Sequence, residues 1–134
     1  MPGIGDLDRD FIRTFQVIDG VIQRGQPLFG LVWLGSALAL LAGLVIGLGQ
    51  VVGTERILLA VAAGMYVLGV QLPTFTINVP LNNLLQAVDV VDGNEAAWRS
   101  ARDSFEAPWN RWNAIRTVIA IGTTVILLIL LLRM

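Results

Sequence analysis

Three long stretches of this chain contain no charged residue, and they constrain its fold more than any other feature. They cover residues 25–54, 57–88 and 117–132. A helix needs about 20 apolar residues to cross a hydrocarbon core of roughly 30 Å. Only 14% of the 134 residues are charged and 55% are hydrophobic, which leaves too little polar sequence to cover three such helices in water. The sequence therefore predicts an all-α membrane helical bundle rather than a soluble one.

The bundle is predicted to be a single membrane domain over residues 1–134, with three transmembrane helices. An amphipathic helix over residues 6–24 precedes them, because one face of an otherwise polar segment is apolar and should lie along the membrane interface. That face carries Phe11, Phe15, Ile18 and Ile22. The spans are predicted at residues 28–50, 57–79 and 109–133, and a cytoplasmic loop or helix at residues 89–106.

The third charge-free stretch is too short to cross the membrane alone. At a rise of 1.5 Å per residue, its roughly 16 residues form a helix about 24 Å long. A helix that crosses the hydrocarbon core must be roughly 30 Å long. The span must therefore begin in the polar segment that precedes it, which brings polar side chains to the inner boundary of the hydrocarbon. Four of them share one helical face at i, i+3, i+4 and i+7: Trp109, Trp112, Asn113 and Arg116.

A second polar face is expected at the end of the second span, at the same depth. Thr74, Asn78 and Asn82 follow one another at i, i+4 and i+8. Pro73 and Pro80 lack the amide proton that a helix interior needs, so the backbone should kink or open here. Two helices would thus bring amides and one arginine together, and an ionisable residue inside the membrane is a functional hypothesis by default.

Each of these residues also has a purely structural interpretation. Tryptophans at a membrane boundary anchor a helix, an arginine there reaches the headgroups, and asparagines join helices by hydrogen bonds. Asp19 is the carboxylate nearest to the predicted polar site. It is either a functional group or a solvated charge on the interfacial helix.

The arginines indicate the orientation, because cytoplasmic flanks of membrane helices carry the excess of positive residues. Most of the nine basic residues, all of them arginines, lie on one side of a model with three spans: Arg9, Arg13, Arg24, Arg99, Arg102, Arg111 and Arg116. Arg56 and Arg133 lie on the other side. The amino terminus is therefore predicted to be cytoplasmic and the carboxyl terminus to be outside.

The composition excludes several kinds of function. There is no cysteine and no histidine, which removes thiol chemistry, the commonest metal ligand and the usual base at neutral pH. The net charge is −1 and lysine is absent, so nothing indicates binding to nucleic acid. We expect no metal and no cofactor, and the expected partners are the lipid bilayer and a small molecule.

Small residues recur at every fourth position of the first span: Gly35, Ala39, Gly43 and Gly47. This spacing lets two helix backbones approach closely. The partner is either another helix of the same chain, which we favour, or a second copy in a homo-oligomer.

The segments "NVPLNN" and "FEAPWNRWNAIRT" resemble the anthrone oxygenase-like family of small bacterial and fungal membrane proteins, most of unknown function. The start "MPGIGDLDRDFIRTFQVIDGVI" and the later "QPLF" are also similar to it, so the resemblance covers almost the whole chain. It marks Asn78, Pro80, Asn82, Trp109, Trp112, Asn113 and Arg116. The family usually has four spans, one of them ahead of the Met-Pro-Gly stretch. Without that helix, one side of the bundle would be open to lipid or to a second copy.

The resemblance implies oxidation of an anthrone or similar polycyclic phenol by dioxygen without an added cofactor. Such a reaction needs a base, a group that stabilises the enolate oxygen and a flat apolar slot. Asp19 is the candidate base, and Arg116, Asn113 and Asn78 are the candidates that hold the oxygen. The candidates for contact with the substrate are Trp109, Trp112, Asn82 and Thr74.

A second function class stays open at this point. The same residues can belong to a small non-catalytic binding or accessory subunit that holds a lipid, a quinone or a partner helix. A transporter fits least, because the spans contain neither buried ion-pair candidates nor an inverted repeat. Arginine without lysine, together with abundant glycine and alanine, favours a bacterial source with a GC-rich genome, and hence the inner (plasma) membrane.

The orientation can be tested with topology reporters. Because the arginines place the amino-terminal side inward, a reporter fused after Met134 should report the outside. One inserted near Gly93 should report the cytoplasm. The reverse labelling would contradict this orientation.

Overall fold

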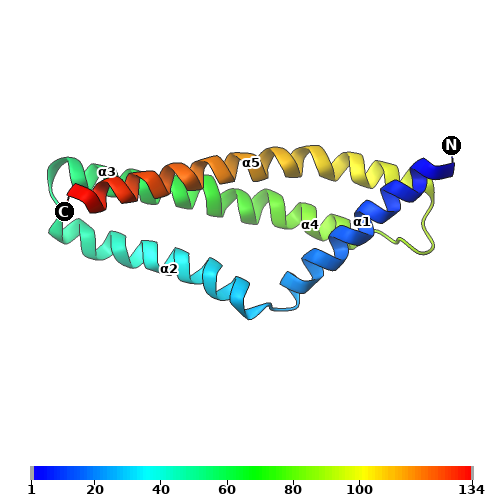
Figure 1. The fold of residues 1–134 in the computed structure, drawn as a ribbon, viewed down its shortest axis with the longest axis horizontal. Coiled ribbons are helices and arrows are strands. Elements are labelled where there is room, and N and C mark those ends of the chain that lie inside the picture. The colour runs from blue at the N-terminus through cyan, green and yellow to red at the C-terminus, as the bar shows by residue number, and fades with distance from the viewer. Residues whose placement is uncertain (1, 134) are drawn as a thin grey trace. The chain divides into compact units, whose positions relative to one another are not determined.

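The computed structural model describes residues 2–133, and over these residues the protein is helical without any strand (Figure 1). The elements are α1 (Pro2–Gln23), α2 (Pro27–Gln50), α3 (Gly53–Tyr66), the π-helical segments η1 (Val67–Gln71) and η2 (Thr74–Asn78), α4 (Val79–Gln86) and α5 (Glu95–Arg133). Three stretches are long and apolar enough to cross a membrane: Pro27–Gln50, Gly53–Gln86 and Glu95–Arg133. The prediction of an all-α fold with three such helices is confirmed.

The chain forms two compact units. Unit 1 combines Met1–Gln26 with Phe75–Asn113, and unit 2 combines Pro27–Thr74 with Ala114–Met134. Unit 1 contains α1, α4 and the first part of α5. Unit 2 contains α2, α3, η1 and the remainder of α5.

The helix α5 is much longer than the span expected at residues 109–133. It has 39 residues and begins at Glu95, and Pro108 lies inside it without ending it. Its start is fixed by Asn94, whose side-chain oxygen accepts the backbone N–H of Ala97 at 2.9 Å. Such a cap satisfies one of the donors that the first turn of a helix leaves unpaired.

The core of unit 1 joins its three helical segments through the buried side chains of Ile12, Leu85, Trp98 and Phe105. Phe15 packs its ring against Phe105 with a centroid distance of 4.7 Å. The apolar face predicted for the membrane interface is therefore divided, because Phe11 and Phe15 pack against this core, whereas Ile18 and Ile22 remain exposed. Aromatic partners on α5 offer the two phenylalanines more contact than a lipid surface does.

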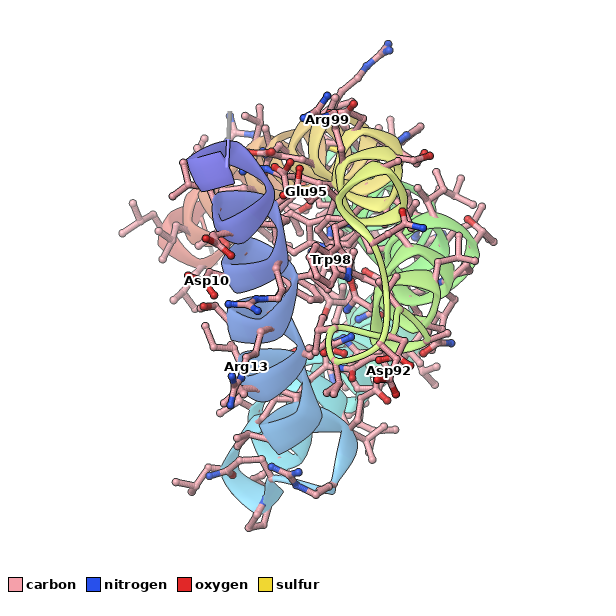
Figure 2. The ribbon with its side chains drawn as sticks, turned by 90° about the vertical axis from the view of Figure 1, so that its right-hand side faces the viewer. Asp10, Arg13, Asp92, Glu95, Trp98 and Arg99 are labelled. Carbon is pink, nitrogen blue, oxygen red and sulfur yellow. The ribbon has the colours of Figure 1, made fainter. Side chains whose placement is uncertain are left out.

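Trp98 fixes the connection between α4 and α5. Figure 2 shows its ring directed inward beside α1, with Asp10 and Arg13 on the outside of α1. The indole N–H of Trp98 donates to the carbonyl of Asp89 at 2.8 Å. The Asp89 carboxylate accepts the backbone N–H groups of Val91 and Asp92. These two hydrogen bonds, chiefly the one from Asp92, hold the pKa of Asp89 below its usual value.

An ion-pair network joins the start of α1 to α5. Asp8 is buried, and its Oδ1 lies 3.1 Å from Nη1 of Arg102. Nε of Arg102 lies 2.7 Å from the carboxylate of Glu106, and Nε of Arg99 is 3.9 Å from Asp8. The charge of Asp8 is therefore neutralised within unit 1.

The backbone between α3 and α4 opens as expected around the two prolines. The segment η1 ends two residues before Pro73, and η2 ends two residues before Pro80. A proline ring clashes with the carbonyl of the preceding turn in an α-helix, and a π turn widens that turn. The wider turn of η1 aligns residues five apart, so the side-chain amide of Gln71 donates to the hydroxyl of Tyr66 at 2.8 Å.

One glycine of the row of small residues on α2 lies in close contact with another helix of unit 2. A Cβ added to Gly47 would lie 2.5 Å from Cδ2 of Leu59, whereas one added to Gly35 or Gly43 would meet nothing within 4 Å. Leu59 also belongs to the buried cluster of this unit, with Val51 and Leu130. The internal contact that we favoured thus involves one end of the row, and assembly with a second copy stays a prediction.

Gly69 provides a test of packing in unit 2. A Cβ at this position would lie 2.7 Å and 2.8 Å from two methyl carbons of Ile119, and a β-branched side chain cannot rotate away easily. Gly69→Ala should therefore lower the stability by about 1–3 kcal/mol, measured as thermal unfolding in detergent. Gly64→Ala is the control, because its Cβ would meet nothing within 4 Å. Equal melting temperatures for both variants would contradict the close contact.

Candidate functional site

A buried carboxylate, Asp19, is the centre of the polar interior of unit 1. It is 5% exposed. Its Oδ2 accepts hydrogen bonds from Nε2 of Gln23 at 2.6 Å and from Nε2 of Gln86 at 2.9 Å. Its Oδ1 accepts one from Nδ2 of Asn82 at 2.9 Å. We call these four residues, two from α1 and two from α4, the Asp19 cluster.

The orientation of Asn82 within the cluster is set by α5. Its side-chain oxygen accepts the indole N–H of Trp109 at 2.8 Å. An indole nitrogen only donates, so it must face the oxygen of the amide. The amide nitrogen of Asn82 consequently faces Asp19.

Gln86 is also held from two sides. Besides its bond to Asp19, its Nε2 donates to the backbone carbonyl of Gln16 at 3.1 Å. In return, Nε2 of Gln16 donates to the carbonyls of Leu85 and Val88, each at 2.9 Å. The last carbonyls of a helix lack partners within it, and Gln16 supplies a donor to them where α4 ends.

Asp19 forms no ion pair within the described part of the chain, which distinguishes it from Asp8. Both carboxylates are buried on α1, but Asp8 lies against Arg102. Within the described residues, the side-chain partners of the Asp19 carboxylate are three amides. Among the described residues no group of three or more acidic side chains could hold a metal ion.

Asn78 is another buried polar group of unit 1. It is 3% exposed, and neither its side-chain oxygen nor its nitrogen has a hydrogen-bond partner. It lies in η2, four residues before Asn82. A buried amide without partners costs about 1–3 kcal/mol, and such an exception calls for an explanation such as a ligand or an ordered water.

Arg116 and Thr74 lie together in unit 2. Nη1 of Arg116 donates to the hydroxyl of Thr74 at 2.7 Å. That hydroxyl donates to the carbonyl of Val70 at 2.6 Å, so it links the arginine to the opened backbone. The expectation that Arg116 holds one oxygen together with Asn113 and Asn78 stays a prediction.

The two tryptophans of the predicted face have different surroundings. The ring of Trp109 is stacked on Phe105 with a centroid distance of 5.9 Å and an angle of 27°. It also meets Phe15 edge-on. Trp112 is partly buried and has no such ring contact in the described structure. Stacking of either tryptophan on a substrate remains a prediction.

Several polar residues of the two units were not among the predicted site residues. Gln86 is one of them, although it continues the i, i+4 series of Asn78 and Asn82. In unit 2, the hydroxyls of Ser36 and Tyr66 lie 3.0 Å apart. The hydropathy of the second span concealed Tyr66, because a single hydroxyl hardly changes the average of an apolar stretch.

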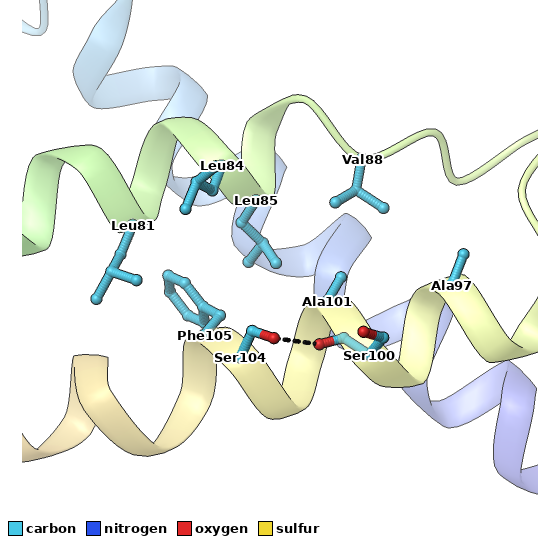
Figure 3. A pocket seen from close by; sticks show the side chains of 9 residues that line it. All are labelled: Leu81, Leu84, Leu85, Val88, Ala97, Ser100, Ala101, Ser104 and Phe105. Atoms are coloured by element: carbon cyan, nitrogen blue, oxygen red, sulfur yellow. Dashed lines mark hydrogen bonds between the residues drawn. The ribbon is translucent and has the colours of Figure 1, made fainter.

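An apolar groove lies between α4 and α5 on unit 1 (Figure 3). Its volume is about 480 Å³, within the range of small-molecule sites. It is lined by Leu81, Leu84, Leu85, Val88, Ala97, Ser100, Ala101, Ser104 and Phe105. The hydroxyl of Ser104 donates to the carbonyl of Ser100. No residue of the Asp19 cluster lines this groove, which contains no ionisable side chain.

The sequence matches one known family. A family model described as anthrone oxygenase covers residues 19–126, a range that contains every residue of the Asp19 cluster as well as Asn78, Thr74 and Arg116. No curated protein and no solved structure matches the chain.

The bond from Trp109 to Asn82 can be tested through stability. Trp109→Phe keeps an aromatic ring beside Phe105 but leaves the side-chain oxygen of the partly buried Asn82 without this donor. It should lower the free energy of unfolding by about 1–3 kcal/mol, measured as thermal unfolding in detergent. Trp112→Phe is the matched control on the same helix. If both variants melt at the same temperature, the bond does not hold Asn82.

Proposed function

This chain belongs to the anthrone oxygenase family, and we propose that it oxidises an anthrone or similar polycyclic phenol with dioxygen. The reaction converts the central methylene group of the substrate into a ketone and needs no added cofactor. In this proposal Asp19 is the base that removes the first proton.

The observation that carries the proposal is the burial of the Asp19 carboxylate without an ion pair in the described part of the chain. A carboxylate without a cation is costly inside a protein, and a purely structural role would be filled at lower cost by an amide or by a paired acid such as Asp8. Gln23, Asn82 and Gln86 donate the hydrogen bonds that a charged carboxylate accepts at this position.

The chemistry balances with dioxygen alone. Asp19 takes one proton from the methylene carbon, and the electron pair of that C–H bond passes into the aromatic enolate. One electron moves from the enolate to dioxygen, and the resulting superoxide and carbon radical combine to a peroxide at the same carbon. The peroxide takes up a proton, loses the second proton of that carbon and splits its O–O bond. The products are the quinone and one water.

The developing enolate oxygen needs a hydrogen-bond donor, and Asn78 is the candidate of unit 1. Its amide is buried and without a partner, so it can donate without breaking an existing bond. Donors aimed at a developing oxyanion contribute most where water is excluded. Arg116 and Asn113 remain proposed as further donors, and Trp109, Trp112, Asn82 and Thr74 as residues that contact the substrate.

The proposed location is the plasma membrane of a bacterium, with the amino terminus in the cytoplasm. Three helices that can span a membrane support the membrane location. Polycyclic phenols partition into lipid, so a membrane enzyme would meet its substrate where it accumulates.

A second candidate function follows from the apolar groove between α4 and α5. Its lining has no ionisable side chain, which suits an acyl chain or a quinone ring held without chemistry. A non-catalytic binding or accessory subunit would use the groove and would not depend on Asp19.

Oxygen consumption separates the two candidates. Purified protein should consume dioxygen when an anthrone is added, and Asp19→Asn should lower kcat by about a hundredfold or more, the usual contribution of a general base. Asp8→Asn is the matched control, a second buried carboxylate of α1 whose loss should lower the melting temperature but not the turnover.

Two results would contradict the enzyme. One is wild-type protein that consumes no dioxygen above the rate of the free substrate. The other is equal turnover for Asp19→Asn and the wild type. Binding of a fluorescent fatty acid or quinone that Leu84→Gln weakens, without any turnover, would favour the binding subunit.

A further inference from the structure

Every hydrogen-bond partner of Asp19 in the described structure is a donor. Gln23, Asn82 and Gln86 all present an N–H group to the carboxylate. A charged carboxylate accepts all three bonds, but a protonated one carries an O–H group that needs an acceptor. Asp19 can therefore take up a proton without a penalty only if one of the amides turns and presents its oxygen.

Two of the three amides cannot turn. Asn82 is fixed because its oxygen accepts the indole N–H of Trp109, and a turned amide would place two donors against each other. Gln86 is fixed because its nitrogen also donates to the backbone carbonyl of Gln16. A turned Gln86 would direct its oxygen at that carbonyl.

Gln23 differs from both. It is the last residue of α1 and its side chain is exposed. Its other side-chain bond within the described residues is a long one, 3.4 Å, to the side-chain oxygen of Asn83. Asn83 is exposed as well, so its own amide can turn to offer the opposite group. Rotation of Gln23 therefore breaks no buried interaction.

No neighbouring charge forms an ion pair with Asp19 within the described residues. The helix α4 has no ionisable side chain, and on α5 Arg102 and Arg99 pair with Asp8. On α1, Arg24 folds back over Gly20 and forms no ion pair with Asp19 within the described part of the chain. The hydrogen bonds of a protonated Asp19 therefore depend on the three amides.

We propose that Gln23 is a proton gate for Asp19. While Asp19 is charged, Gln23 donates to its Oδ2. When Oδ2 receives a proton, the Gln23 amide turns by about half a revolution. Its oxygen then accepts a hydrogen bond from the new O–H group. The proton then leaves to water at the exposed end of α1, and both side chains return to their first arrangement. Gln23 is a positioning residue, because it acts through Asp19.

The purpose of the gate rests on the proposed function, because the gate would regenerate Asp19 as a base after each proton transfer. Its structural basis is independent, because it concerns only how a protonated Asp19 is bonded. It can therefore be tested without any turnover.

Infrared difference spectroscopy during acid titration gives this test. A protonated carboxyl has its own carbonyl band, and Asp19→Asn identifies the band of Asp19 in the full-length protein in detergent. In Gln23→Met the O–H has lost its acceptor, so the band should move to a higher wavenumber. Asn83→Ala, which removes the other partner of Gln23, should leave the band in place. An unchanged band in Gln23→Met would overturn the gate.

Enzyme kinetics provide a second test of the gate. Gln23→Met should lower kcat about tenfold with KM unchanged, and it should enlarge the solvent deuterium isotope effect, because proton release becomes slower. A purely structural role of Gln23 would leave the isotope effect unchanged and would overturn the gate. If the wild type does not turn over, the proposed function fails, while the infrared result still decides whether Gln23 turns.

Discussion

The cost of burying one carboxylate without an ion pair constrains the arrangement of unit 1. Asp19 needs several donors in place of water. Those donors come from α4 as well as from α1, and Trp109 of α5 fixes one of them. Three segments that are distant in sequence are thus tied to a single charge. The same hydrogen bonds thus help to specify which helices pack together within unit 1.

Much of the fold could be predicted from the sequence, because charge-free stretches of sufficient length have few alternatives. The long α5 could not. Its first part is polar and contains Pro108, and it is helical because Trp98 and Phe105 pack against α1 and α4. Of the site, Asp19 and Asn82 were both expected, but not their mutual bond. Periodicity reports which residues share a face of one helix, and it contains no information on pairs from different helices.

Several polar groups of unit 2 are linked in chains of hydrogen bonds that end on the backbone. Arg116 donates to Thr74, which donates to the carbonyl of Val70. The hydroxyl of Ser36 donates to the carbonyl of Trp33, and Ser36 in turn lies beside Tyr66. In a membrane, where no water is at hand, polar side chains need such internal partners. The π turn of η1 supplies the local geometry for one of these contacts.

The hydrogen bonds of Gln16 have a consequence for the order in which the protein is made. Gln16 binds carbonyls that follow it by 69 and 72 residues, and Asp8 binds Arg102, 94 residues further on. A ribosome therefore releases α1 long before any of its partners exists. Until α4 and α5 emerge, Ile12 and Phe15 can be sheltered only by the bilayer surface or by a chaperone.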